Sequence, residues 1–183
     1  MIAASVVEAA RRRAAHILAD AGIVLTDAEK ASIEVADFGL NELEHTGLEL
    51  VTYINTTIYC AKELVLFPHQ TCPEHRHPPV AGGPGKMETF RVRKGRVFLY
   101  TSGEPTATIR ARIPSGGEGC YTVFKEIVLN AGEQYTLPPN TLHWFQADKD
   151  GAIVSEFSSV SRDGSDIFTD PRIQRETRID PSR

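Results

Sequence analysis

The first 46 residues carry the apolar spacing of helices. From Ser5 to Ala21, apolar residues recur every three or four positions, and Gly22 supplies a stop. Thr26 and Glu29 have the spacing of a capping box, which predicts a second helix running to about Leu43. The pattern leaves open whether these helices cover one end of the following β-structure or form a dimer contact.

Beyond Gly47 the pattern changes to short runs rich in β-branched and aromatic residues, separated by Gly, Pro, Asn or Asp. The predicted strands lie within residues 48–60, 63–67, 89–94, 96–101, 106–113, 121–129, 134–137 and 152–157. Regular short strands of this kind predict a sandwich or barrel. We expect an N-terminal helical segment (1–46) and a β-barrel (47–183) in one structural domain, with a charged surface tail from Ser161 onward.

Composition excludes several classes of function. The chain has 183 residues, of which 41% are hydrophobic, and a net charge of -4 without clustered basic residues, which gives no reason to expect nucleic acid as a partner. It has neither a signal-peptide pattern nor a long apolar run, so no membrane association is expected. Three cysteines without a CxxC pair argue against a disulfide framework and favour a reducing, cytoplasmic location.

Four residues form a candidate metal site: His75 and His77 in CPEHRHP, Glu88 in KMETF and His143 in PPNTLHWF. Three imidazoles and one carboxylate suit a divalent transition metal. Because residues i and i+2 of a strand share a face, His75 and His77 could hold one ion from a single strand, with Glu88 and His143 arriving from neighbouring strands. Residue spacing alone makes an ordinary structural role for these histidines the less favoured interpretation.

These blocks resemble the paired motifs of the cupin superfamily. The stretch PPVAGGPGKM between His77 and Glu88 is longer than the usual three or four residues, and its Gly and Pro content predicts a loop. The resemblance implies a mainly β fold, the cupin double-stranded β-helix or jelly roll, preceded by two N-terminal α-helices. The metal would then lie inside the roll.

Lysines and acids near the four candidate ligands suggest catalysis. Lys86 stands two residues before Glu88 and should share its inward face, where a lysine is costly unless it meets a charge or a polar ligand. Lys62 and Glu156 alternate with apolar neighbours, which permits but does not require that they face the cavity. A structural ion pair for Lys86, exposed positions for Lys62 and Glu156, and a simple turn at Asp170 remain open.

A narrower resemblance is carried by the lysine ahead of the HxH strand, the K-x-E that contains the metal glutamate, PPNTLHWFQ, and EFS followed by SRDGSDIFTDPR. From about Lys62 to Arg172 the chain resembles the D-lyxose isomerase family. The resemblance implies an Mn²⁺-dependent aldose-ketose isomerase that interconverts D-lyxose and D-xylulose, and D-mannose and D-fructose as a second pair, through a cis-enediol. A homodimer is expected by analogy with cupins. It implies His75, His77, Glu88 and His143 as ligands, Lys86 and Glu156 as the catalytic pair, and Lys62 and Asp170 as sugar-binding residues. Co²⁺, Fe²⁺ and Zn²⁺ remain alternatives to Mn²⁺.

Three other functions remain open at this stage. A metal-dependent dioxygenase would use the same ligand types, but lysines and acids around the site favour a hydroxyl-rich substrate. A phosphosugar isomerase would need a basic cluster for the phosphate. A non-catalytic sugar-binding cupin would bind the sugar without converting it.

Overall fold

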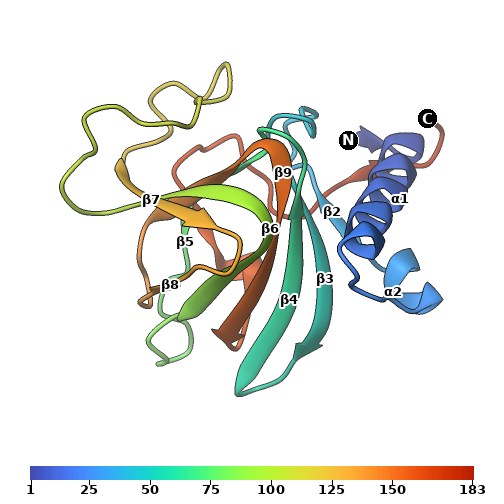
Figure 1. The fold of residues 1–183 in the computed structure, drawn as a ribbon, viewed down its shortest axis with the longest axis horizontal. Coiled ribbons are helices and arrows are strands. Elements are labelled where there is room, and N and C mark those ends of the chain that lie inside the picture. Colours follow the sequence, from blue (N-terminus) through green and yellow to red (C-terminus); the bar gives the residue numbers. More distant parts are fainter.

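Two long strands, β6 (Glu88–Thr101) and β9 (His143–Ser159), form the centre of the protein in the computed structural model, which describes residues 1–183. They pair antiparallel over most of their length, from Glu88 opposite Ser158 to Thr101 opposite His143. The other strands are β1 (Ile2–Ala3), β2 (Glu34–Ala36), β3 (Leu48–Asn55), β4 (Tyr59–Leu66), β5 (Thr71–Arg76), β7 (Lys125–Asn130), β8 (Gln134–Leu137), β10 (Ile167–Phe168) and β11 (Ile179–Asp180). The main sheet runs β10-β5-β9-β4-β3-β2, with β7 and β8 paired to β6, and it curls into the expected β-roll (Figure 1).

Two glycines allow β6 and β9 to bend where the roll turns. The register between these strands shifts on both sides of Gly95, which has a φ of 77°, and Gly151, with a φ of 73°, precedes the residue opposite it, Ala152. A Cβ on Gly95 would collide with the carbonyl oxygen of Gly151. Bulges of this kind bend a strand and increase its twist, which lets both strands serve the two halves of the roll.

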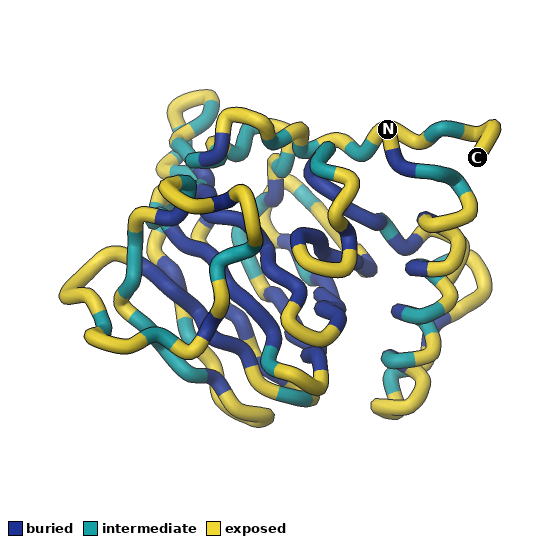
Figure 2. The backbone as a smooth tube through the Cα atoms, turned by 90° about the horizontal axis from the view of Figure 1, so that it is seen from above, coloured by how far each residue is buried: buried dark blue, intermediate teal, exposed yellow.

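One end of the interior of the roll is polar and carries the candidate site. The rest of the interior is an apolar core. Alternate side chains of the central strands form this core, among them Leu64, Phe90, Leu99, Phe145 and Val154. The most continuous burial accordingly runs along the middle of the sheet (Figure 2). Each Å² of apolar surface buried in this core stabilises the fold by about 25 cal/mol, so the core is a main source of the stability of the roll.

Helix α1 (Ala4–Asp20) packs against the outer face of the roll (Figures 1 and 2). Its buried residues Val7, Ala10, Ala14 and Leu18 belong to one cluster with Val65 and Ile153 of the sheet and with Phe67, which follows β4. The predicted first helix is confirmed, and Gly22, at a φ of 76°, follows its end. None of the helices has the length and apolar character needed to cross a membrane.

The second helix is much shorter than the sequence pattern predicted. The capping box of Thr26 and Glu29 is present, but α2 (Asp27–Ala31) ends before Ile33. The chain then enters β2, which pairs with β3. In this extended segment Val35 and Ala36 are buried on opposite faces of the sheet, Val35 in the cluster under α1 and Ala36 in the core of the roll. The predicted helical segment 1–46 therefore includes a strand of the sheet, and the division at residue 47 stays a prediction.

The predicted strand at residues 106–113 is wrong, although this segment alternates apolar and polar residues. Side chains accept three of its backbone N–H groups: Glu126 accepts from Arg110, the Tyr100 hydroxyl accepts from Ala111, and Gln146 accepts from Arg112. A segment satisfied in this way needs no place in a sheet. It forms part of a long ordered loop beside β7.

The C-terminal segment, residues 160–180, is not the loosely attached surface tail that its charge predicted. We call it the C-terminal strap. Its β10 pairs with β5, its β11 pairs with β1, and Gln174 and Thr177 bond the backbone of Phe38 and Val35. The strap crosses the polar end of the roll and contributes several side chains to the cavity described below.

Candidate metal centre and active site

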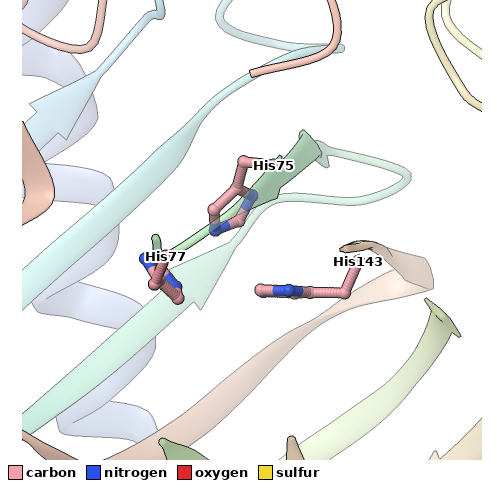
Figure 3. Close-up of side chains that lie close together, drawn as sticks. All are labelled: His75, His77 and His143. Carbon is pink, nitrogen blue, oxygen red and sulfur yellow. The ribbon is translucent and has the colours of Figure 1, made fainter. Parts of the chain in front are cut away.

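Three histidines converge inside the roll. His75 lies on β5, His77 follows the end of β5, and His143 begins β9 directly opposite His75. Their ligand nitrogens all lie within 4.8 Å of one another, and their rings face a common space (Figure 3). All three are buried. The i, i+2 spacing of His75 and His77 and the pairing of β5 with β9 bring them together, as the sequence predicts.

In two of the three rings, a hydrogen bond to the backbone occupies Nδ1 and leaves Nε2 to face the common space. Nδ1 of His75 lies 2.8 Å from the Pro73 carbonyl oxygen, and Nδ1 of His143 lies 2.9 Å from that of Thr141. Because a carbonyl oxygen only accepts, each Nδ1 carries a proton and donates. With Nδ1 used in this way, Nε2 is the nitrogen of each of these two rings that could bind a metal.

Glu88 completes the group. Its Oε1 atom lies 3.2 Å from Nε2 of His77 and 3.0 Å from Nε2 of His143. These three atoms are buried and make no hydrogen bond. Buried polar atoms without partners are costly, and three of them facing one another fit an ion bound between them. Nitrogen and carboxylate donors are the types that Mn²⁺, Fe²⁺, Co²⁺ and Zn²⁺ accept.

The charges of this group follow from burial and from its neighbours. Burial, with His143 and His77 close by, lowers the pKa of His75 well below its ordinary value, so His75 is neutral. Burial also opposes a charge on His77, but Glu88 and Asp166 outweigh it and raise its pKa to about 9. Burial raises the pKa of Glu88, yet Lys86 and the two histidines hold it well below the usual range. Glu88 is therefore a carboxylate, ready to bind a cation.

Lys86 bridges two buried carboxylates. Its Nζ atom lies 2.8 Å from Oε2 of Glu88 and 2.5 Å from Oε1 of Glu156, and all three side chains are at most 5% exposed. Burial lowers the pKa of Lys86, but the two carboxylates outweigh this effect and raise it above the ordinary value. Ser158 donates a further hydrogen bond to Glu156. The expected inward positions of Lys86 and Glu156 are both present, next to the three histidines.

Lys62 also faces inward, where the C-terminal strap meets it. Its Nζ atom lies 2.7 Å from Oδ2 of Asp163 and 3.0 Å from the Ser161 hydroxyl, and Arg175 also contacts Asp163 at 3.1 Å. Burial raises the pKa of Asp163, but Lys62 and Arg175 outweigh it and hold this pKa well below its usual value. Lys62 thus reaches the cavity as part of a charged network.

Asp170 is the one expected site residue that the structure does not bring to the others. Its carboxylate accepts several hydrogen bonds from Arg172, whose guanidinium also contacts the carbonyl of Gly116. Asp170 does not line the cavity. Its short-range bond to Arg172, two residues later, satisfies it locally.

Sequence reasoning missed four cavity residues, all in the C-terminal strap: Asp163, Asp166, Phe168 and Arg175. The charge of the strap predicts a solvated tail. Ile167, Phe168 and Ile173 are the signal against that prediction, because large apolar residues are uncommon in a fully solvated tail. Phe168 in fact stacks on the ring of His75, with 5.3 Å between centroids.

These residues share one cavity inside the roll. Its polar lining includes His75, His77, Lys86, Glu88, Glu156 and the strap acids, and its apolar lining includes Phe38, Leu48, Leu50, Leu64 and Phe145. The arrangement can bind a small polar molecule next to a metal, a lysine and a carboxylate base.

The β-roll that these strands form is the cupin fold, and the three histidines inside it could hold a metal ion. The chain matches the family described as D-lyxose isomerase over residues 26–182. It therefore belongs to the D-lyxose isomerase family, and the membership expected from the motifs is confirmed.

Individual relatives agree with this assignment. The chain is 66% identical to the D-lyxose ketol-isomerase of Cohnella laeviribosi, with 91% of each chain covered. It is 61% identical to the D-lyxose/D-mannose isomerase of Thermosediminibacter oceani, over 98% of this chain and 99% of that enzyme. The L-ribose isomerase of Acinetobacter sp. DL28, solved with L-ribose, shares the fold with a TM-score of 0.80 at 16% identity, over 98% of both chains.

Proposed function

We propose that the protein interconverts D-lyxose and D-xylulose by moving hydrogen between C1 and C2 through a cis-enediol. The observation that supports this most directly is the buried lysine Lys86, held between the candidate ligand Glu88 and the carboxylate Glu156 beside three histidines. The names of the close relatives support the substrate. We propose D-mannose and D-fructose as a second pair, because the T. oceani relative is named for D-mannose as well.

His75, His77, Glu88 and His143 are the proposed ligands of a divalent ion, and Mn²⁺ is the proposed ion. Their unpartnered buried atoms support this assignment, while Co²⁺, Fe²⁺ and Zn²⁺ accept the same donor types. An ion bound there would polarise the sugar carbonyl and stabilise the developing negative charge by several kcal/mol.

Glu156 is the proposed general base. It would take the proton from C2 of the aldose and return it to C1 of the enediol, while the hydroxyl proton of O2 passes to O1, so that one carboxylate serves both carbon proton transfers. Lys86 stays protonated, because two carboxylates raise its pKa, and its charge would offset the negative charge that develops on the sugar oxygens. The cavity keeps both side chains out of bulk water, which strengthens each of these interactions.

Lys62 is the proposed sugar-binding residue at the strap. Because Asp170 is bonded to Arg172 outside the cavity, we assign the carboxylate of this subsite to Asp163 instead. Charged groups that already hold one another in place can bond sugar hydroxyls with little loss of side-chain entropy.

The same network argues against a phosphorylated substrate. The three cations of the cavity, Lys62, Lys86 and Arg175, each contact a carboxylate. A phosphate group binds best to cations that have no such partner, usually several together. The polar lining of the cavity also suits a hydroxyl-rich substrate better than the apolar substrate of a dioxygenase.

Incubation of the metal-loaded protein with D-lyxose in deuterated water tests the proposal. Proton NMR should show D-xylulose and loss of the C2 proton signal from the recovered aldose, because a base that exchanges with solvent introduces deuterium there. Sugar binding without product would instead indicate a non-catalytic binding protein. Parallel incubations with D-mannose and with a phosphorylated pentose rank the substrates.

Two further properties belong to the proposal. We infer a homodimer by analogy with cupins, which light scattering on the purified protein tests. Free cysteines at positions 60, 72 and 120 support a cytoplasmic location, where thiols stay reduced.

A further inference from the structure

The ring of His77 is held differently from the rings of the other two histidines. His75 and His143 each donate from Nδ1 to the carbonyl two residues earlier in the chain, at Pro73 and Thr141. Local backbone therefore fixes these two rings as soon as their strands form. His77 instead bonds a side chain 89 residues away: its Nδ1 atom lies 2.5 Å from Oδ1 of Asp166 in the C-terminal strap.

The bond to His77 is the one side-chain hydrogen bond that Asp166 makes. Its side chain is 6% exposed and lines the cavity, but it is not one of the four proposed ligands. With Nδ1 turned toward Asp166, Nε2 of His77 faces Oε1 of Glu88 at 3.2 Å. A carboxylate behind a histidine fixes the orientation of the ring and makes its free nitrogen a stronger ligand.

The strap is attached to the strand of the ligands at this place. Phe168 pairs with His75 in the register of β10 and β5, and its ring stacks on the imidazole. The next residue, Thr169, donates from its backbone N–H and from its hydroxyl to Glu74. Asp166, Phe168 and Thr169 thus contact three positions, 77, 75 and 74, and all three contacts would break if this part of the strap moved away.

We propose that Asp166 is the positioning residue that orients His77 toward the metal, and that closure of the C-terminal strap is thereby coupled to metal binding. This inference rests on the proposed metal site. Coupling is reciprocal: if strap closure raises the metal affinity by some factor, metal binding raises the ratio of closed to open strap by the same factor.

Three variants test the inference: Asp166→Ala, Asp166→Asn and the control Glu176→Gln, which removes an exposed carboxylate from the same strap. Mn²⁺ binding to the metal-free proteins is measured by calorimetry. Loss of a carboxylate behind a ligand histidine typically weakens metal binding by about 10- to 100-fold, which we expect for Asp166→Ala. Asp166→Asn keeps an acceptor oxygen and should weaken it less, while Glu176→Gln should match the parent.

Hydrogen exchange provides the readout that a purely structural role would not change. In the parent, Mn²⁺ should slow exchange of the strap amides, including that of Thr169, by about 10-fold or more, in line with the coupling above. In Asp166→Ala the metal should change this rate much less. Circular dichroism of the metal-free proteins establishes that each variant is folded.

The outcomes separate this inference from the proposed function. Equal Mn²⁺ affinity in the parent and in folded Asp166→Ala would overturn the role of Asp166 while leaving the metal site intact. Strap exchange that does not respond to Mn²⁺ in the parent would overturn the coupling. If the parent itself binds none of Mn²⁺, Co²⁺, Fe²⁺ or Zn²⁺, the proposed metal site fails, and this inference fails with it.

Discussion

Replacing Glu156 by glutamine removes the proposed base with little change in shape. Glu156 is 4% exposed, and its Oε1 atom lies 2.5 Å from Lys86. The amide oxygen of glutamine can still accept that hydrogen bond, and Lys86 keeps its contact with Glu88 at 2.8 Å. The fold and the metal ligands should therefore be unaffected, while the side chain can no longer take a proton.

The expected loss of activity follows from the role of a general base. Such a group typically contributes about 10²- to 10⁴-fold to the rate, which is roughly 3–5 kcal/mol of transition-state stabilisation. We expect kcat for D-lyxose isomerisation to fall by this factor and deuterium exchange at C2 to fall with it. Bound metal, measured by plasma emission spectrometry, should equal that of the parent.

Glu118→Gln is the matched control, because Glu118 is exposed in the loop beside β7 and the chemical change is the same. It should keep the activity of the parent. If Glu156→Gln retained more than about a tenth of the parental kcat with a full complement of metal, Glu156 would not be the base. If the variant lost its metal, the rate would report on the ion instead, and the argument from the Lys86 bridge would be wrong.

Two other predictions concern binding and stability. Lys62→Ala should raise KM more than it lowers kcat, reducing kcat/KM by about 10- to 100-fold, since a hydrogen bond to a charged group contributes about 1.5–3 kcal/mol; steady-state kinetics with D-lyxose would contradict this by showing a loss in kcat alone. Burial raises the pKa of Glu49 to about 8 from 4.5. The folded state then keeps a proton that the unfolded state loses between these pH values, so the stability of the parent should fall as pH rises through this window, at up to about 1.4 kcal/mol per pH unit. Urea unfolding at pH 5 and pH 8 should show a flatter dependence for Glu49→Gln, and parallel curves for the two proteins would contradict the assignment.

The parts of the site that the sequence predicted depend on short-range rules. Extended chain alternates sides, so His75 and His77 both turn inward although His77 lies just after β5, and so do Lys86 and Glu88 although Lys86 lies just before β6. Strand pairing then supplies the one long-range step, between β5 and β9. Local geometry and one strand pairing are therefore enough to bring these residues together, as the structure does.

The parts that failed depend on partners that local sequence does not reveal. Residues 106–113 have strand-like alternation, but Glu126, Tyr100 and Gln146 bond their backbone instead of a strand. The strap is highly charged, yet Arg175 pairs with Glu34 and Thr177 bonds Val35 across more than 140 residues of chain. Charge predicts solvation only when no buried opposite charge is available, and one sequence does not show that distant partner.

The central claim is that a metal-dependent isomerase site lies inside the roll. The most direct test measures conversion of D-lyxose to D-xylulose by protein stripped of metal and then restored with Mn²⁺, under air and under nitrogen. We expect no conversion without metal, recovery of the conversion with Mn²⁺, and equal rates of conversion in both atmospheres. Full activity in the stripped protein, or turnover that requires oxygen, would contradict it.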